Sequence, residues 1–244
     1  MSATPTAVGT REAPQETREL RAGLRTFLDR PLSDFLANAP TDRRGRSISI
    51  GAVKCGVYAF FDYDGEPIYV GQTRESLGQR ISRHLTNQRT DAVAMSVLDP
   101  FEVRSVAVWP LPQYQDKREG AADHLDALER KVFATLVEES RFKKILNEKD
   151  PVGSDLEEMP ISIKGDIVPE DVRRVREHPD VRIARRAMTI ARLSQIIAGR
   201  KVGVGLRRTL LTQADRLAWL ASARFEALGG EAAVETENGD DEEG

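Results

Sequence analysis

The sequence predicts an α+β fold: a small antiparallel sheet of three strands flanked by helices, with a helical arm before it and a helical, basic region after it. Three observations lead to this class. Residues 56–71 have a hairpin pattern, residues 101–109 have the composition of a further strand, and residues 77–85 and 121–146 have the apolar spacing of amphipathic helices. The 244 residues are enough for one or two domains with a sizeable core.

The hairpin pattern consists of two apolar runs on either side of Asp64-Gly65. Asp-Gly is typical of a two-residue turn, whose central residues both need positive φ. If these two residues form the loop, Tyr63 pairs with Glu66, and paired residue numbers sum to 129 along the ladder. Phe60 then lies opposite Tyr69.

By the same register, Tyr58 lies opposite Gly71. Side chains alternate between the faces of a strand, so the two faces of the hairpin differ in character. One face carries two phenols and a glycine, which leaves open space above it: Tyr58, Phe60, Tyr69 and Gly71. The other is a plain core face: Val57, Ala59, Phe61, Ile68 and Val70. This assignment depends on loop length, because a three- or five-residue loop would place the tyrosines on opposite faces.

The tripeptides Gly56-Val57-Tyr58 and Tyr69-Val70-Gly71 resemble the paired motifs of the GIY-YIG nuclease superfamily, with valine in place of isoleucine. Leu77–Leu85 is similar to the first helix of the family and contains Arg80 and His84. Glu129 resembles the metal-binding carboxylate, and Asn147 resembles an asparagine near the end of the domain. The resemblance covers residues 55–147.

This resemblance implies a metal-dependent DNA endonuclease that hydrolyses phosphodiester bonds. It makes Tyr58 the general base for the attacking water, which requires positive charge nearby because an unperturbed phenol has a pKa of about 10. Arg80 would supply that charge and contact the phosphate. Tyr69 would position the water or a phosphate oxygen, and His84 would donate a hydrogen bond to phosphate.

The resemblance also assigns Glu129 as the ligand of Mg²⁺ or Mn²⁺, and one carboxylate is enough for such an ion. Asn147 would orient Glu129 or the backbone around it. Glu138 and Glu139 are alternative carboxylates on the same helix. Gln72 departs from the family pattern, since many members have lysine after the second tripeptide.

Each assignment has an ordinary structural alternative. The two tyrosines could be strand aromatics, and Arg80 could be a surface ion-pair partner. His84 could equally be a half-buried helix residue, and Glu129 could be a solvated residue at the edge of its helix. Asn147 could cap the C-terminus of a helix, a place that asparagine favours.

Along the chain, composition and the resemblance together predict five segments, the resemblance supplying the nuclease-like one. Residues 1–16 are rich in Thr, Pro and Ala and are expected to be disordered. Residues 17–50 form a helical arm, broken at Pro31, and a basic connector. Residues 51–150 form the nuclease-like domain. Residues 160–228 form a helical basic region with fourteen Lys and Arg against seven Asp and Glu, and residues 229–244 form a disordered acidic tail with seven acids and no base.

The arginine-rich part of the basic region, residues 169–200, is the best candidate for contacting DNA, and a solvated helical surface is the alternative. Cleavage of both strands by chains with one active site each would favour a homodimer. A restriction or defence role fits the compact chain best. A structure-selective repair or recombination nuclease and a non-catalytic DNA-binding module are the alternatives.

Other properties concern location. No apolar run approaches the ~20 residues that span a bilayer, and the N-terminus lacks the pattern of a secretory signal. The single cysteine, Cys55, cannot form an internal disulfide and is expected to be buried. These features favour a cytoplasmic protein that does not bind membranes.

Overall fold

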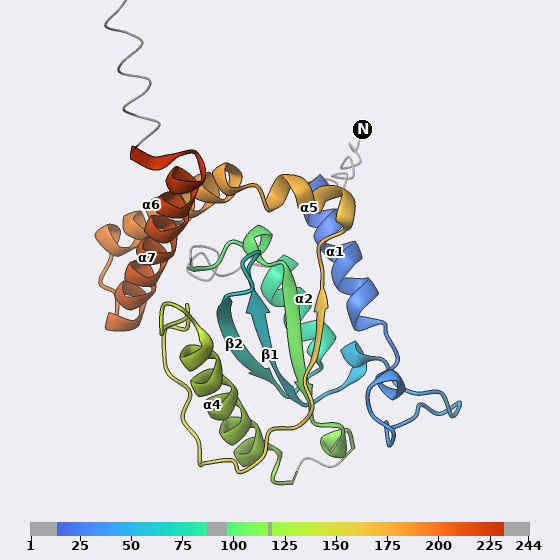
Figure 1. Cartoon of the computed structure of the whole chain (residues 1–244). Helices are drawn as coiled ribbons and strands as arrows, with labels where there is room; N and C mark the ends of the chain where they lie inside the picture. The colour runs from blue at the N-terminus through green and yellow to red at the C-terminus, as the bar shows by residue number, and fades with distance from the viewer. Residues whose placement is uncertain (1–13, 87–96, 117–118, 232–244) are drawn as a thin grey trace, which may run out of the picture.

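A computed structural model of the chain describes residues 14–86, 97–116 and 119–231 (Figure 1). Its helices and strands follow in the order α1 (Gln15–Leu28), β1 (Gly56–Phe61), β2 (Pro67–Thr73), α2 (Leu77–Thr86), β3 (Ser105–Pro110), α4 (Ala121–Glu139), β4 (Ile163–Asp166), α5 (Glu170–Arg176), α6 (Pro179–Gly199) and α7 (Val204–Ala227). Short 3-10 turns lie between them at Leu32–Asp34, Ile50–Ala52, Pro100–Glu102 and Pro112–Tyr114.

Within these described residues the strands form one antiparallel sheet of four, in the order β2-β1-β3-β4. Helix α4 packs on one face, against β1 and β2, while α1 and α2 cover the other (Figure 1). The α+β class is confirmed, but the predicted number of strands is wrong. The strand missing from the predicted sheet is β4. It contributes just one buried side chain, Ile163, so its apolar pattern is weak.

The two tyrosines of the hairpin between β1 and β2 share a face as predicted, but the loop and the face of Ile68 differ from the prediction. Asp62 N donates to Glu66 O at 3.0 Å, so the loop has three residues, and only Gly65 among them has positive φ (78°). Phe61 therefore pairs with Pro67, and Ile68 is the extra residue of a bulge before Phe60 pairs with Tyr69. On its own, the three-residue loop would place Tyr69 on the opposite face from Tyr58. The bulge at Ile68 shifts the alternation once more and returns Tyr69 to the face of Tyr58.

The two faces bury separate cores. Val57, Ala59 and Val70 pack with the apolar stripe of α4, and Cys55 is buried in the same cluster. Tyr58 and Phe60 belong to the other core, with α1 and α2. Because of the bulge, Ile68 belongs to this second core and not to the α4 face where alternation had placed it.

Helix α4 ends at Glu139, seven residues before the predicted end at Leu146. A tertiary contact redirects the chain there. Ser140 is extended (ψ 134°), its buried Oγ donates to Glu66 Oε2 at 3.0 Å, and Arg141 Nε donates to Glu66 Oε1 at 2.8 Å. The prediction failed because Glu66 is far from residue 140 in sequence, and helical spacing does not register such a contact.

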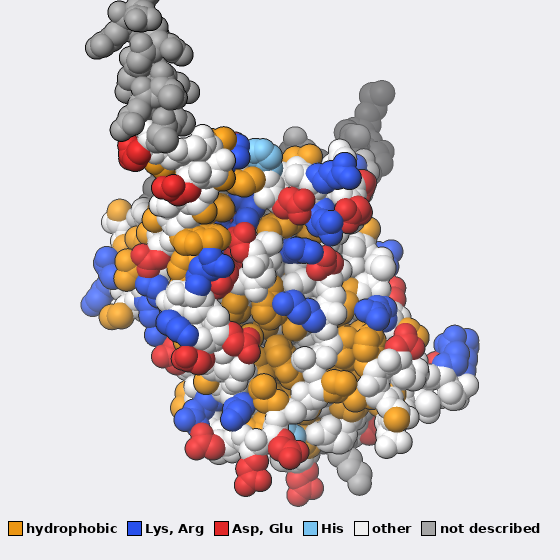
Figure 2. Space-filling model, in the orientation of Figure 1, with side chains coloured by type: hydrophobic (Ala, Val, Ile, Leu, Met, Phe, Trp, Pro, Cys, Tyr) orange, Lys and Arg blue, Asp and Glu red, His pale blue; other side chains and the backbone are white. Residues whose placement is uncertain are grey.

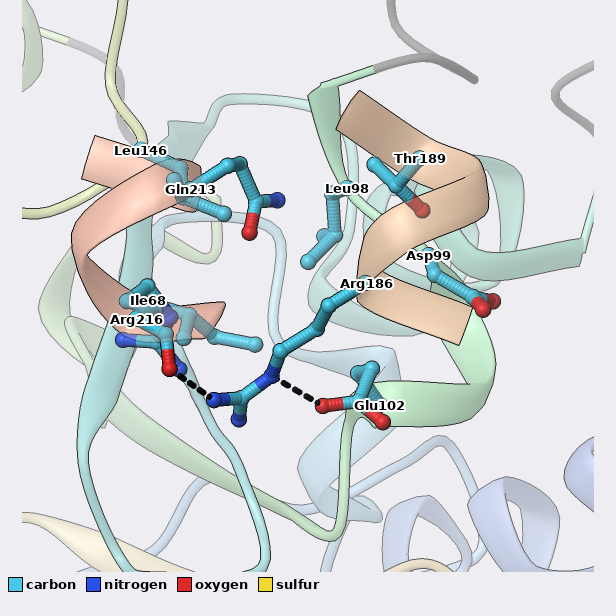
Figure 3. Close-up of a pocket in the computed structure, with 9 residues that line it drawn as sticks. All are labelled: Ile68, Leu98, Asp99, Glu102, Leu146, Arg186, Thr189, Gln213 and Arg216. Atoms are coloured by element: carbon cyan, nitrogen blue, oxygen red, sulfur yellow. Dashed lines mark hydrogen bonds and ion pairs between the residues drawn. The ribbon is translucent and has the colours of Figure 1, made fainter. Parts of the chain in front are cut away.

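Helices α6 and α7 pack against each other and against the turn end of the hairpin through buried ion pairs. Arg186 Nη2 donates to Asp62 Oδ2 at 3.0 Å, Arg186 Nε donates to Glu102 Oε2 at 2.9 Å, and Arg216 also pairs with Asp62. Figure 3 shows Arg186 reaching from α6 to Glu102 on one side and to the carbonyl oxygen of Arg216 on the other. Arg182 pairs with Asp64 in the same cluster.

The surface over these helices is mixed in charge. On the face shown in Figure 2, lysine and arginine side chains alternate with aspartate and glutamate. The expected disorder of residues 1–16 and 229–244 falls almost entirely outside the described residues. Within the described ranges, no helix is long and apolar enough to cross a membrane.

Candidate active site

The two tyrosines lie side by side on the face of the hairpin that α2 covers. Their ring centroids are 6.3 Å apart, and both rings are largely buried. Tyr58 on β1 pairs with Gly71 on β2, and an ideal Cβ at Gly71 would be 2.6 Å from the Tyr58 hydroxyl oxygen. The space above this glycine is thus occupied by the Tyr58 phenol, and glycine is needed there for close approach.

We expect Gly71→Ala to displace the Tyr58 ring, because a Cβ contact of 2.6 Å cannot be accommodated without movement. The cleavage rate should fall about 100-fold if Tyr58 handles the proton, since an ångström of misplacement in a catalytic group costs about that much. Steady-state cleavage assays would measure it. Gly203→Ala is the matched control, because its Cβ would meet no atom within 4 Å. An unchanged rate in Gly71→Ala would mean that the cleavage rate does not depend on the position of the Tyr58 ring.

Helix α2 brings Arg80 and His84 to Tyr58. Its buried stripe is Leu77, Ile81 and Leu85, which places residues 80 and 84, one turn apart, along the flank next to the sheet. Arg80 Nε donates to the Tyr58 hydroxyl oxygen at 3.3 Å, and His84 Nδ1 lies 3.3 Å from the same oxygen. The His84 ring also packs edge-on against Tyr69, with centroids 4.5 Å apart.

Burial and charge set the protonation states of this group. Burial raises the pKa of Tyr58, while the Arg80 guanidinium acts in the opposite direction. Burial raises the pKa of Tyr69 further above its ordinary value. Burial, assisted by the positive charge of Arg80, lowers the pKa of His84 to about 4. At neutral pH both phenols are therefore protonated and His84 is neutral.

Glu129 lies on α4 beside the end of β2. It is half-buried, and its Oε2 accepts a hydrogen bond of 3.1 Å from Gln72 Nε2. The same amide nitrogen donates to Asp126 Oδ1 at 2.6 Å. Gln72, at the position where many family members have lysine, therefore holds two carboxylates together without neutralising them.

Electrostatic effects connect Glu129 to the tyrosine group. Burial, with a contribution from the negative charge of Asp126, raises the pKa of Glu129 to about 7, and the Gln72 hydrogen bond and the Arg80 charge oppose this rise. The charge of Glu129 in turn helps to raise the pKa of Tyr58 and of Tyr69. Glu129 is thus only partly exposed, and it shares an electrostatic environment with both tyrosines and Arg80.

Asn147 is placed differently from the other predicted site residues. It is buried, its Oδ1 accepts from Val70 N at 3.0 Å, and its Nδ2 donates to Val70 O at 2.9 Å. This amide satisfies the outer backbone edge of β2, between the two site positions Tyr69 and Gly71, as a neighbouring strand would. The Asn147 side chain thus contacts β2 and not Glu129 or the backbone around it, where it was expected, and α4 has ended well before Asn147.

The alternative carboxylates lie away from this group. Glu138 and Glu139 are exposed at the last turn of α4, and Glu138 pairs with Lys143 at 3.0 Å. Asp126 is the residue that sequence analysis missed. Its position three residues before Glu129 on a helix puts both on one face, and that spacing could have identified it.

The carboxylates of Glu129 and Asp126 suit a hard divalent cation. Mg²⁺ and Mn²⁺ prefer oxygen ligands, and Mg²⁺ typically binds through one or two carboxylates and otherwise keeps water or substrate oxygens. Among the described residues, no three His, Cys, Asp or Glu side chains gather closely enough to hold a metal by themselves. Two carboxylates, one with a raised pKa and neither paired with a cation in a hydrogen bond, match the Mg²⁺ pattern.

Comparison with known proteins agrees with this geometry. The family model described as the GIY-YIG catalytic domain matches residues 54–133, which include Tyr58, Tyr69, Arg80, His84 and Glu129 but not Asn147. No curated protein and no solved structure matches the chain. Residues 54–133 therefore form a nuclease domain of the GIY-YIG superfamily.

Proposed function

We propose that this protein is a divalent-metal-dependent DNA endonuclease with Tyr58, Tyr69, Arg80, His84 and Glu129 at its active site. One observation carries the proposal: the Tyr58 hydroxyl oxygen receives a hydrogen bond from Arg80 and lies within 3.3 Å of a neutral imidazole. A buried phenol between a fixed positive charge and a proton acceptor is arranged to take a proton from water. A phenol in a purely structural role would need neither partner.

The proton path follows from the protonation states. Water attacks phosphorus and the bond from phosphorus to the leaving 3′ oxygen breaks, and this oxygen takes a proton from solvent. At the same time a proton of the attacking water moves to the Tyr58 oxygen, and the Tyr58 proton moves to His84 Nδ1, in the tautomer that leaves Nδ1 unprotonated. A concerted transfer of this kind avoids a free phenolate, which burial disfavours. The bound phosphate, being negative, favours the imidazolium that forms on His84. The guanidinium of Arg80 faces the same oxygen and would stabilise negative charge that develops at the phosphate.

Glu129 would hold Mg²⁺ or Mn²⁺, with Asp126 beside it and Gln72 keeping the two carboxylates in position. When bound, such an ion supplies Lewis-acid stabilisation of charge on the phosphate and the leaving oxygen. Asn147 supports this side of the site indirectly, because it holds the backbone of β2 at Val70.

A plasmid-nicking assay with Mg²⁺ tests the function. Conversion of supercoiled plasmid to nicked and linear forms is the expected result. No conversion at any Mg²⁺ or Mn²⁺ concentration would contradict the nuclease proposal and favour a non-catalytic DNA-binding module.

The proposed role in restriction or defence predicts discrete fragments from site-specific cleavage. Cutting confined to branched or flapped DNA would indicate a repair or recombination nuclease instead. The proposed homodimer predicts linear products without accumulation of the nicked form.

Metal binding should depend on pH. Because burial raises the folded-state pKa of Glu129 to about 7 from its ordinary value of 4.5, its contribution to stability is fully present below pH 4.5 and is lost as pH rises through 7. A divalent ion that binds the ionised Glu129 carboxylate restores this lost stability at high pH. At lower pH a proton occupies the carboxylate and competes with the ion. Addition of Mg²⁺ should therefore raise Tm more at pH 8 than at pH 6, by about 2–4 °C, which corresponds to roughly tenfold in affinity. Differential scanning calorimetry would measure the shift, and a pH-independent shift would contradict Glu129 as the ligand.

A further inference from the structure

The arginines of the C-terminal helices are largely occupied by carboxylates. Arg182, Arg186 and Arg216 are buried in the cluster around Asp62, and three others are paired elsewhere. These are Arg173 with Glu170, Arg176 with Glu19, and Arg185 with Glu16 and Asp99. An arginine held in this way would have to break an ion pair before contacting a phosphate. The richest run of arginine in the sequence is therefore not the best surface for DNA.

Arginines of α1 are placed differently. Arg21 and Arg25 are one helical turn apart and exposed, and neither pairs with a carboxylate within the part of the chain that the structure describes. The carboxylates of this helix, Glu16 and Glu19, are directed to Arg185 and Arg176. Arg21 and Arg25 thus keep their charge available, and α1 lies outside residues 54–133 that the family model matches.

Arg21 and Arg25 line a groove of about 460 Å³ between α1 and α2. Glycines make room for it: Gly51 and Gly78 meet there, and an ideal Cβ at Gly78 would be 2.9 Å from the Gly51 carbonyl oxygen. Most of the other lining residues are polar and uncharged, and include Ser49, Ser76, Gln79, Ser82 and Thr86. Asp29 is the one carboxylate among those residues, and Arg21 Nη2 donates weakly across the groove to Thr86 O at 3.5 Å.

The groove and the active site share helix α2. Ser82 lies two residues after Arg80 and two before His84, so it projects from the opposite flank of the helix. A helix with its side chains is about 10–12 Å wide, which equals roughly three base pairs of rise in duplex DNA. A strand whose scissile phosphate lay at Tyr58 and Arg80 could therefore cross α2 and place phosphates over the groove within a few base pairs.

We propose that the groove between α1 and α2 binds the sugar–phosphate backbone of duplex DNA beside the cleavage site, with Arg21 and Arg25 as the phosphate contacts. This inference rests on the proposed function, and it names the surface that holds the substrate. Guanidinium groups and serine and threonine hydroxyls are common phosphate contacts, and they position the duplex without reading its sequence.

The test measures binding separately from chemistry. The Arg21→Ala/Arg25→Ala double variant is titrated with a fluorescein-labelled mixed-sequence duplex, without divalent metal, over about 50–200 mM salt. Loss of two phosphate contacts should reduce the slope of log K against log salt by about 1.8 and weaken binding roughly tenfold at low salt.

The matched control is Arg200→Ala/Arg207→Ala, which removes the same charge from two exposed arginines near the α6–α7 connection. An equal loss in this control would mean that net charge alone is responsible, and would overturn the groove assignment. So would an unchanged slope in the Arg21/Arg25 variant while the parent protein binds DNA. A parent protein that binds no duplex at low salt would contradict the proposed function itself, and the groove with it.

Discussion

Glu129→Gln should abolish cleavage while DNA binding persists. The substitution keeps the size of the side chain and removes the carboxylate that we assign to the metal. Charge stabilisation by a metal in phosphoryl transfer amounts to several kcal/mol, so the rate should fall about a thousandfold or more. Binding should be unchanged or tighter, because a negative charge next to the phosphate is removed. Single-turnover cleavage with Mg²⁺ and fluorescence anisotropy without it would measure the two effects.

Glu138→Gln is the control for this variant. It makes the same chemical change on the same helix, at an exposed position whose partner is Lys143. It should cleave like the parent protein. An active Glu129→Gln variant would refute the metal assignment, and a Glu138→Gln variant with equal loss would show that the effect comes from α4 as a whole.

The hairpin shows both the reach and the limit of sequence reasoning. The Tyr58–Gly71 and Phe60–Tyr69 pairs were predicted correctly, although the loop on which they depended was not. Loop length and the bulge at Ile68 are separate deviations whose effects on alternation cancel. Local propensity favoured the two-residue turn at Asp64-Gly65. Its actual form depends on Glu66 and Asp62, whose partners, among them Arg141 and Arg186, lie more than 70 residues away.

The site was predictable to the extent that it lies in motifs. The contacts of Tyr58 with Arg80 and His84 follow from one hairpin and one amphipathic helix, and both were evident from spacing. The pairing of Asp126 with Glu129 through Gln72 was not recognised, because it joins a strand to a helix across 54 residues and changes one expected charge. The contact of Asn147 with Val70 could not be inferred either, since residue 147 was expected to end a continuous helix.

A charge pattern in the sequence does not show which groups its charges contact. A run of arginine on a helix has the same appearance whether its charges face phosphate or neutralise buried acids. The acids here, Asp62 and Glu102, sit in a hairpin and a 3-10 turn far from α6 in sequence. Only the fold shows that the arginines of α6 and α7 join these helices to the catalytic domain.

Asp62→Asn should therefore have the largest effect on stability. Asp62 is 1% exposed, and its Oδ2 accepts from Arg186 at 3.0 Å and pairs with Arg216. The cluster balances three carboxylates, Asp62, Asp64 and Glu102, against three guanidinium groups, those of Arg182, Arg186 and Arg216. Asparagine can still accept from the backbone N–H groups of the turn, so the loss isolates the charge. Leaving a buried guanidinium without its partner costs about 3–5 kcal/mol in the free energy of unfolding.

Urea denaturation followed by circular dichroism would measure this loss, with Asp180→Asn as the control. Asp180 also pairs with an arginine, Arg224, at 2.9 Å, but at an exposed position where water screens the charges. The control should unfold at nearly the parent midpoint. A small effect in both variants would mean that water, or a change in protonation of a neighbouring group, compensates the guanidinium charge that Asp62→Asn leaves unpaired. A large effect in Asp62→Asn alone would make α6 and α7 an integral part of the catalytic fold, because the charge that holds them is provided by the same hairpin that carries Tyr58 and Tyr69.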